Sequence, residues 1–473
     1  LRKFGCYTVP DFVGTRYGGN LARFCAVVVL TVASFTYVTA QINATGTIAS
    51  VALDIDFKYA VYIGLISILL CSMLGGMRAV TWTQVAQYIV LIIAYLLPIF
   101  WISNKMGAGF FPHFMLADEV ARIGELEQQF GFVKNSAADL ATVPKGLAGI
   151  TKAHSAVNAT PWAFISLALA MMMGTASLPH VMMRYFTTPS VKAARKSVGW
   201  SLFFIFLLYS SAPMLATLSK LSLIDPTLPT GIIGKSFAEV QSLDWFQNWN
   251  SANLMFISDF NGNGTLELNE FFMGGKAVVL ATPEIAGLPY VISGLVAAGG
   301  MAAAMSTADG LILAIANAIS HDVYYKMIDP KAETAKRLLV ARVLLVVIGF
   351  AGATIAAMEI QGILGSVIWA FDFAMSGLFF PLVLGVWWKR ANREGAIAGM
   401  VLGLGSAIWY LVWVRTGGSG FLGLTQLTFG IFGAAVSFVA MVVVSLMTSA
   451  PDASIQKMVD EVRIPSGKTV TGK

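Results

Sequence analysis

Two neighbouring hydroxyl residues lie inside a long apolar segment of alanines and glycines. Ser306 and Thr307 occupy the middle of GLVAAGGMAAAMSTADG, within residues 285–319. Two hydroxyls and the carbonyl of Ala303, one helical turn earlier, would offer neutral oxygens to a hard cation such as Na⁺. Hydroxyls in apolar helices also often bond back to a carbonyl of the preceding turn. The residues alone leave both interpretations open.

A second polar group interrupts the apolar segment MMMGTASLPHVMMRYF. Gly174 and Pro179 are expected to break a helix there, and Thr175 and Ser177 lie between them. Irregular backbone at membrane depth is tolerated only where it faces protein or a water-filled cavity, and transporters bind substrates at such breaks. The pattern therefore predicts either a substrate-binding segment or a simple proline kink.

Two further polar residues are candidates for an ion pathway. Asp372 lies in WAFDFAMSGLFFP, where a carboxylate costs on the order of 3 kcal/mol to insert in a membrane. It would act on a proton or cation, or make a hydrogen bond to a neighbouring helix. Gln84 opens the apolar segment 80–101, where it is a functional candidate as a polar residue of a membrane segment or joins helices by hydrogen bonds.

A polar segment, DFNGNGTLELNE at residues 259–270, has the pattern of a calcium-binding EF-hand loop. Such a loop places oxygen ligands at positions 1, 3, 5, 7, 9 and 12, with glycine at position 6. Only three of the six candidates are carboxylates, so weak binding of Ca²⁺ is expected. An Asn-Gly turn without a metal would have a similar composition. The six candidate ligands are Asp259, Asn261, Asn263, Thr265, Glu267 and Glu270.

The composition places the chain in a membrane. Of its 473 residues, 57% are hydrophobic and only 12% charged, whereas soluble domains are usually about 25% charged. Basic residues are scattered rather than gathered into a stripe, which argues against binding of nucleic acid. Ten segments are long and apolar enough to cross a bilayer: 20–42, 57–74, 80–101, 162–183, 198–219, 285–319, 337–358, 361–388, 394–414 and 424–448.

The basic residues also predict the orientation of these segments. Lys and Arg gather in alternate short links, which marks those links as cytoplasmic. Both ends of the chain are then cytoplasmic, including the tail 449–473, and the protein is expected to span the bacterial inner membrane many times. The long polar links 102–161 and 220–283 would lie outside. No cluster of His, Glu or Cys in the apolar segments suggests an enzyme.

Three motifs resemble the sodium:solute symporter family, and the resemblance extends over nearly the whole chain. They are GGMRAVTWTQVAQ (75–87), GTASLPHVMMRYFTTPSVKAARKS (174–197) and GLVAAGGMAAAMSTADGLILAIANAISHDVYYKMID (294–329). The last two are similar to the cation/acetate symporter branch more than to the proline or sugar branches. The resemblance implies that 1–473 is a single transmembrane symporter domain.

The resemblance implies an all-α, leucine-transporter-like bundle of two inverted repeats that works by alternating access. Ala303, Ser306 and Thr307 fall where the eighth core helix binds sodium, and 174–180 falls beside the substrate cavity. A small monocarboxylate such as acetate is the expected substrate, although no basic residue within an apolar segment supports that preference. Proline-like or sugar-like solutes, and a transporter-like sensor, are the alternatives.

Two details qualify this expectation. YTVPDFVGTRYG, residues 7–18, resembles the cytoplasmic link after the second core helix, so core helices one and two and an outer leading helix are expected to be missing from this chain. About ten transmembrane helices would remain. The resemblance places Gln84 on the ion pathway, on the cation's way inward. Many family members carry Asp there, which leaves sodium or proton coupling open.

Overall fold

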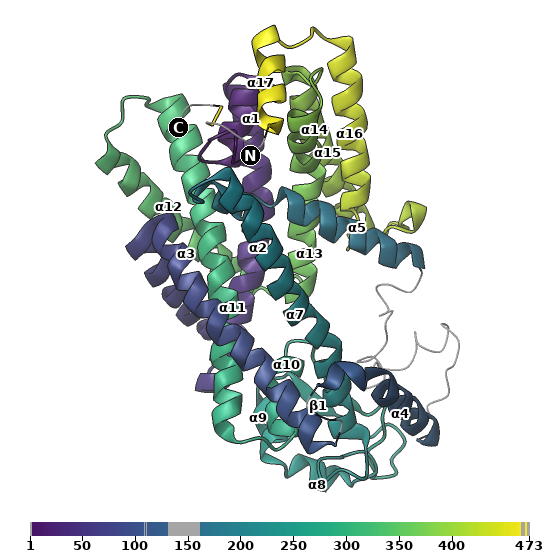
Figure 1. Ribbon diagram of the computed structural model, residues 1–473. Helices are drawn as coiled ribbons and strands as arrows, with labels where there is room; N and C mark the ends of the chain where they lie inside the picture. Colours follow the sequence, from purple (N-terminus) through teal and green to yellow (C-terminus); the bar gives the residue numbers. More distant parts are fainter. Residues whose placement is uncertain (1, 108, 110, 131–160, 465–468, 471–473) are drawn as a thin grey trace.

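The computed structural model describes residues 2–107, 109, 111–130, 161–464 and 469–470. The described chain is largely helical, and its first and last parts lie at the same end of a long helical bundle (Figure 1). We call this the terminal end. The bundle helices are α1 (Val9–Tyr17), α2 (Asn20–Leu53), α3 (Phe57–Lys105), α5 (Pro161–Ser177), α6 (Pro179–Phe186), α7 (Val191–Ile224), α11 (Tyr290–Asn317), η5 (Ala318–Ile328), α12 (Thr334–Ala357), α13 (Ile363–Ala374), η6 (Met375–Phe379), α14 (Phe380–Trp387), α15 (Arg393–Arg415), α16 (Gly430–Met447) and α17 (Ala453–Arg463).

Within the described residues, nine helices are long and apolar enough to cross a membrane. They are α2, the second part of α3, α5 with α6, α7, α11 with η5, α12, α13 with η6 and α14, α15, and α16. The expected segment 57–74 corresponds to Phe57–Met73, an apolar helix of less than spanning length in the first part of α3. The two parts of α3 meet at Gly76, whose φ of 60° only glycine adopts readily.

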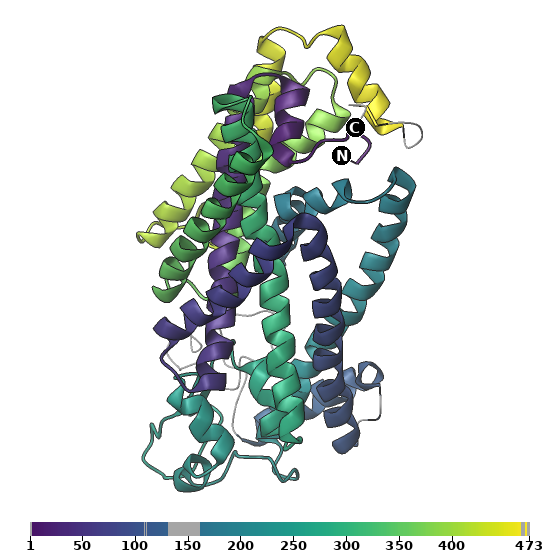
Figure 2. The ribbon, with the colours of Figure 1, turned by 90° about the vertical axis from the view of Figure 1, so that its left-hand side faces the viewer.

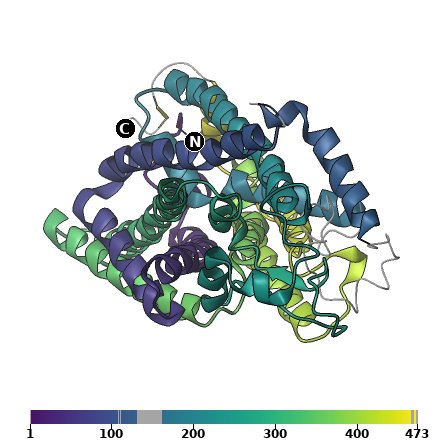
Figure 3. The same cartoon turned by 90° about the horizontal axis from the view of Figure 1, so that it is seen from below.

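Helix α2 holds the bundle together, because it packs against α3, α11 and α12 as well as against α13 and α15. Viewed along the bundle from below, α2 is enclosed by these neighbours (Figure 3). Glycine permits the close approach of α2 to α3, since a Cβ atom on Gly46 would lie 2.6 Å from Cγ2 of Val61. Helices α13 to α16 form a second group beside the first (Figure 2).

The end opposite the termini carries a small compact region rather than more long helices (Figures 1 and 2). A short antiparallel pair of strands places Met255 opposite Met273, and Trp249, Leu266 and Phe271 are buried beside it. We call this region the cap. Its elements are η1 (Pro112–Phe114), α4 (Leu116–Gln129), α8 (Phe237–Gln241), α9 (Asp244–Ser251), β1 (Met255–Ile257), β2 (Phe271–Met273) and α10 (Val278–Ile285).

The two links that were expected to lie outside the membrane both contribute to the cap. Helix α4 comes from the first link and is held against α7 by an ion pair between Lys220 and Glu127. Residues 131–160 of that link lie outside the described residues. The second link supplies α8, α9 and both strands. The expected C-terminal tail contains the single helix α17 within its described part.

Candidate functional site

Helix α11 carries the three predicted cation ligands on consecutive turns. The hydroxyl of Ser306 donates a hydrogen bond to the carbonyl of Ala303 over 2.8 Å. Ser306, Thr307 and Ala303 are all half-buried, and α11 packs between α2 and α3. This geometry agrees with the interpretation in which a helical serine bonds back to a carbonyl of its own helix. Sodium binding by the same oxygens stays a prediction.

Gln84 of α3 joins this group. Its Nε2 donates to the carbonyl of Ser306 over 2.5 Å. One turn further along α11, Gly310 leaves room for two side chains from other helices. A Cβ atom there would lie 3.1 Å from Nη2 of Arg184, on α6, and 3.6 Å from Nε2 of Gln84. The structure therefore places an amide and a guanidinium beside the predicted cation ligands.

Asp309 is a residue of this region that the sequence analysis did not single out. It is fully buried, and Oδ1 of its carboxylate accepts a hydrogen bond from the hydroxyl of Ser72 over 2.9 Å. Its other oxygen accepts no hydrogen bond from any described residue. A carboxylate two residues after Thr307, within an apolar segment, was a signal that could have found it.

The predicted helix break is present. Helix α5 ends at Ser177, α6 begins at Pro179, and Leu178 between them has extended backbone (φ −66°, ψ 119°). Helix α6 packs against α2 and α11, so the break lies next to the helix that carries Ser306. Gly174 permits a close approach of α5 to α13, since a Cβ atom there would lie 2.6 Å from Cβ of Phe371.

The two hydroxyls at the break are bound to their own helix. Thr175 donates to the carbonyl of Met171 over 2.6 Å, and Ser177 donates to that of Met173 over 2.8 Å. Beyond the break, buried His180 packs edge-on against Tyr37, with ring centres 5.7 Å apart. The segment thus combines an interrupted helix with the packed rings of His180 and Tyr37. Substrate binding by its residues remains a prediction.

Asp372, the other residue predicted for an ion pathway, does not lie in the group around Ser306. It is fully buried on α13, where it faces Gly430 of α16, because a Cβ atom on that glycine would lie 2.5 Å from Oδ1 of Asp372. Gln84 lies on α3 and contacts α11. The structure therefore brings Gln84, rather than Asp372, to the Ser306 group.

The calcium-like loop curls around its acidic side chains. Asp259 accepts hydrogen bonds from the amides of Gly262 and Gly264 over 2.7 and 3.0 Å, and both glycines have positive φ. At the other end, Glu270 is fully buried, and its carboxylate accepts the amides of Phe260 and Glu267 over 2.9 and 3.0 Å.

The middle of the loop is anchored in the cap. Leu266, at position 8 of the pattern, is buried, and its main chain pairs with Gly234 and Lys235 over 2.9 and 2.8 Å. The amides of Asn261 and Asn263 both contact Glu267 over 2.9 Å. The loop therefore has the turn conformation and the clustered oxygens of its pattern, and binding of Ca²⁺ by it stays a prediction.

Comparisons with known proteins identify the family. The sodium:solute symporter family model matches residues 1–221 and 276–403, on both sides of the calcium-like loop. The chain is 35% identical to an uncharacterized symporter of Cupriavidus necator, over 98% of this chain and 80% of the relative. It is 27% identical to a monocarboxylic acid transporter of Corynebacterium glutamicum, over 86% of this chain and 66% of the relative.

A solved structure shows the same fold. A Na⁺-coupled sialic acid symporter, in a substrate-bound outward-open state, matches with a TM-score of 0.60 and 16% identity, over 94% of this chain and 78% of that chain. The expectation of an all-α, leucine-transporter-like membrane bundle is confirmed, and the family consists of transporters rather than enzymes. Because the family model matches most of its length, the chain belongs to the sodium:solute symporter family.

Proposed function

We propose that the protein carries a small organic solute across the membrane together with Na⁺, by alternating access. The contact between Ser306, Ala303 and Gln84 supports this proposal most directly, because one turn of α11 gathers two carbonyls and a hydroxyl, and the amide of Gln84 on α3 holds one of those carbonyls. Thr307, the next residue, adds a second hydroxyl. Such neutral oxygens suit a hard monovalent cation. Proton coupling is the alternative, because Gln84 stands where a carboxylate would bind the cation more strongly.

The proposed substrate is a short monocarboxylate such as acetate. The transporter of Corynebacterium glutamicum to which the chain is similar carries monocarboxylic acids. The position of Arg184 also favours an anion, since its guanidinium reaches Gly310 from the helix that follows the break. The cavity would then lie beside Gly174, Thr175, Ser177 and Pro179. A sugar-like solute has no carboxylate and would need no such positive charge, whereas the carboxylate of a proline-like solute would suit it as well.

Uptake of radiolabelled acetate into proteoliposomes tests both proposals, with the natural protein at full length. We expect uptake to require an inward sodium gradient and to be lost when Ser306→Ala is combined with Thr307→Ala. Ser293→Ala, on the same helix, serves as the control and should transport normally. Uptake driven by a proton gradient alone would overturn sodium coupling, and absence of acetate uptake under either gradient would overturn the substrate.

We further propose that the terminal end faces the cytoplasm of a bacterial cell and that the cap faces outward. The distribution of Lys and Arg over the short links supports this orientation. A reporter enzyme that is active only in the cytoplasm, fused after α17, should be active. Activity of a periplasmic reporter at the same position would reverse the orientation.

We also propose that the loop 259–270 binds Ca²⁺ and stabilises the cap. The buried Glu270 carboxylate supports this, because its charge has only backbone amides as partners among the described contacts. Calcium should raise the melting temperature of the protein, and Glu270→Gln should abolish that rise. Asp244→Asn, which removes one charge from an exposed position of the cap, is the matched control. An equal rise in the wild type and Glu270→Gln would contradict the proposal.

A further inference from the structure

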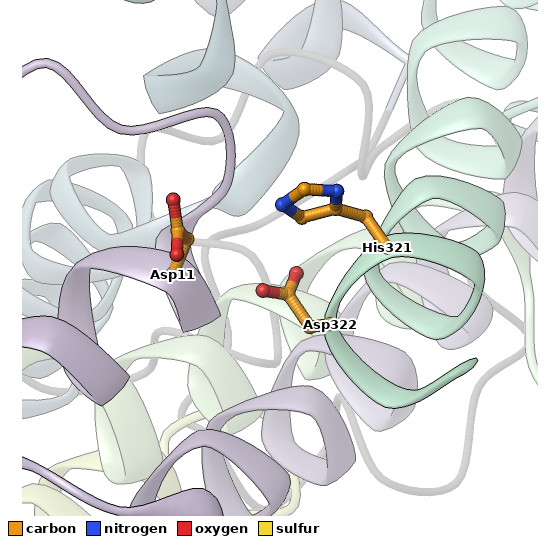
Figure 4. Close-up of side chains that lie close together, drawn as sticks. All are labelled: Asp11, His321 and Asp322. Carbon is orange, nitrogen blue, oxygen red and sulfur yellow. The ribbon is translucent and has the colours of Figure 1, made fainter. Parts of the chain in front are cut away.

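A second group of potential metal ligands lies at the terminal end, far along the bundle from the cap. It joins α1, which precedes the first long helix, to η5, the wide-turned continuation of α11. Asp11 comes from α1, and His321 and Asp322 are neighbours on η5. One ligand atom from each of the three lies within 4.8 Å of the other two (Figure 4).

Burial makes this group unlike a solvated acidic patch. Asp322 is fully buried and Asp11 is 6% exposed. The hydroxyl of Thr8 accepts the amide of Asp11 over 3.0 Å and donates to Oδ2 of Asp322 over 2.6 Å. Oδ1 of Asp322 accepts no hydrogen bond from any described residue. A fully buried carboxylate oxygen therefore faces the cluster without a donor.

Arg23 of α2 brings a positive charge close to both carboxylates. Its Nη2 and Nε lie 3.7 Å from Oδ1 of Asp11 and Oδ1 of Asp322, which is longer than a hydrogen bond. The guanidinium rests on Gly14, where a Cβ atom would lie 2.7 Å from it. Arg23 thus reduces the repulsion between the two carboxylates, but it does not satisfy their oxygens.

We propose that Asp11, His321 and Asp322 bind a divalent transition-metal cation, with Zn²⁺ as the best-suited probe. Calcium and magnesium prefer ligand sets made only of oxygens, whereas zinc accepts imidazole nitrogen and carboxylate oxygen together. Three protein ligands leave a fourth tetrahedral position for water. Bonds of about 2.1 Å would bring the ligand atoms to about 3.4 Å from one another, so the side chains need to move inward by roughly an ångström.

Such an ion would compete with Arg23 for the two carboxylates. It would also fasten α1 to η5, and thereby to the helix that carries Ser306. Neither effect depends on which solute is transported, so binding of the metal is separable from the proposed function. Inhibition of uptake by the metal would rest on that function and forms a separate arm of the test.

The test is to titrate Zn²⁺ into purified full-length protein and to measure binding by isothermal titration calorimetry. Glu270→Gln is present throughout so that the cap loop makes no contribution. We expect His321→Ala and Asp322→Asn each to weaken binding at least about tenfold. Asp329→Asn is the control, because it removes one charge at the end of the same helix, where Asp329 pairs with Lys336. This variant should bind zinc as tightly as the parent protein does. Size-exclusion chromatography checks that each variant folds.

Arg23→Gln separates a metal site from a purely structural ion-pair cluster. It should tighten zinc binding several-fold, because it removes the competing cation. Zinc should also inhibit solute uptake by the parent protein and leave His321→Ala unaffected. Failure of the parent to bind zinc, or equal binding by the parent, His321→Ala and Asp322→Asn, would overturn the proposal whatever the outcome of the uptake assay.

Discussion

The side-chain amide of Gln84 lies 2.5 Å from the main-chain carbonyl of Ser306 and donates a hydrogen bond to it. This contact joins α3 to α11 across 222 residues of sequence and holds one wall of the candidate cation site. Gln84 is only 8% exposed and Ser306 is half-buried, so the bond is partly shielded from water. The contact gives the first prediction.

Gln84→Leu should weaken sodium activation of uptake about fivefold, since loss of one hydrogen bond is worth about 1 kcal/mol. The sodium concentration for half-maximal uptake measures this. Gln87→Leu, one turn further along the same helix, is the control and should behave as the wild type. An unchanged sodium dependence in Gln84→Leu would show that the amide does not position the site.

Gly310→Ala should weaken recognition of the anion. The new Cβ would lie 3.1 Å from Nη2 of Arg184 and displace the guanidinium, so KM for acetate should rise several-fold with little change in protein stability. Gly294→Ala is the matched control, because it lies on the same helix with no atom within 4 Å of the new methyl group. Equal KM values in the two variants would exclude a role for Arg184.

Gly174→Ala should lower the stability of the bundle. Its Cβ would lie 2.6 Å from Cβ of Phe371 and 2.9 Å from the backbone oxygen of that residue, and overpacking of this kind costs about 1–3 kcal/mol. Thermal unfolding in detergent measures the effect. Gly199→Ala on α7 adds a methyl group in open space and should leave the melting temperature unchanged or raise it, because alanine favours a helix.

Cys6 should resist alkylation in the folded protein. Burial, followed by the charge of Asp11, raises the pKa of its thiol to about 12, so the reactive thiolate is scarce at pH 8. In a Cys25→Ala/Cys71→Ala background, iodoacetamide should label Cys6 slowly until the protein is unfolded. In the unfolded protein the thiol ionises near its ordinary pKa of 9.0. The contribution of Cys6 to the free energy of unfolding is therefore complete below pH 9 and falls as the pH rises towards 12. Rapid labelling of folded protein at pH 8 would contradict this.

Local patterns in the sequence predicted most of the bundle. Long apolar runs located the membrane helices, and the Gly174–Pro179 interruption located the helix break, because both effects act over a few neighbouring residues. The segments 57–74 and 80–101 were predicted as separate, and the two parts of α3 do meet between them, at Gly76. The helix 57–74 was predicted to span on hydrophobicity alone, and it is shorter than the other nine.

Contacts between distant segments could not be predicted. Arg184 reaches Gly310, and Asp11 lies beside Asp322, only after helices far apart in sequence have packed together. One sequence contains no signal for such pairs. Asp309 is different, since it stands two residues after Thr307 and is visible in the sequence as a charge in an apolar segment.

The hydroxyl of Thr8 accepts from the first turn of α1 and donates to Asp322. A movement that separates α1 from η5 therefore removes the donor of a buried carboxylate. If the Thr8 hydroxyl instead stays bonded to Asp322, its bond to the amide of Asp11 breaks. The first turn of α1 then loses its cap, which costs about 1 kcal/mol. Opening of the terminal end is thus coupled to fraying of a helix, and its rate should depend on the helix propensity of residues 9–12 as well as on the ions that are bound.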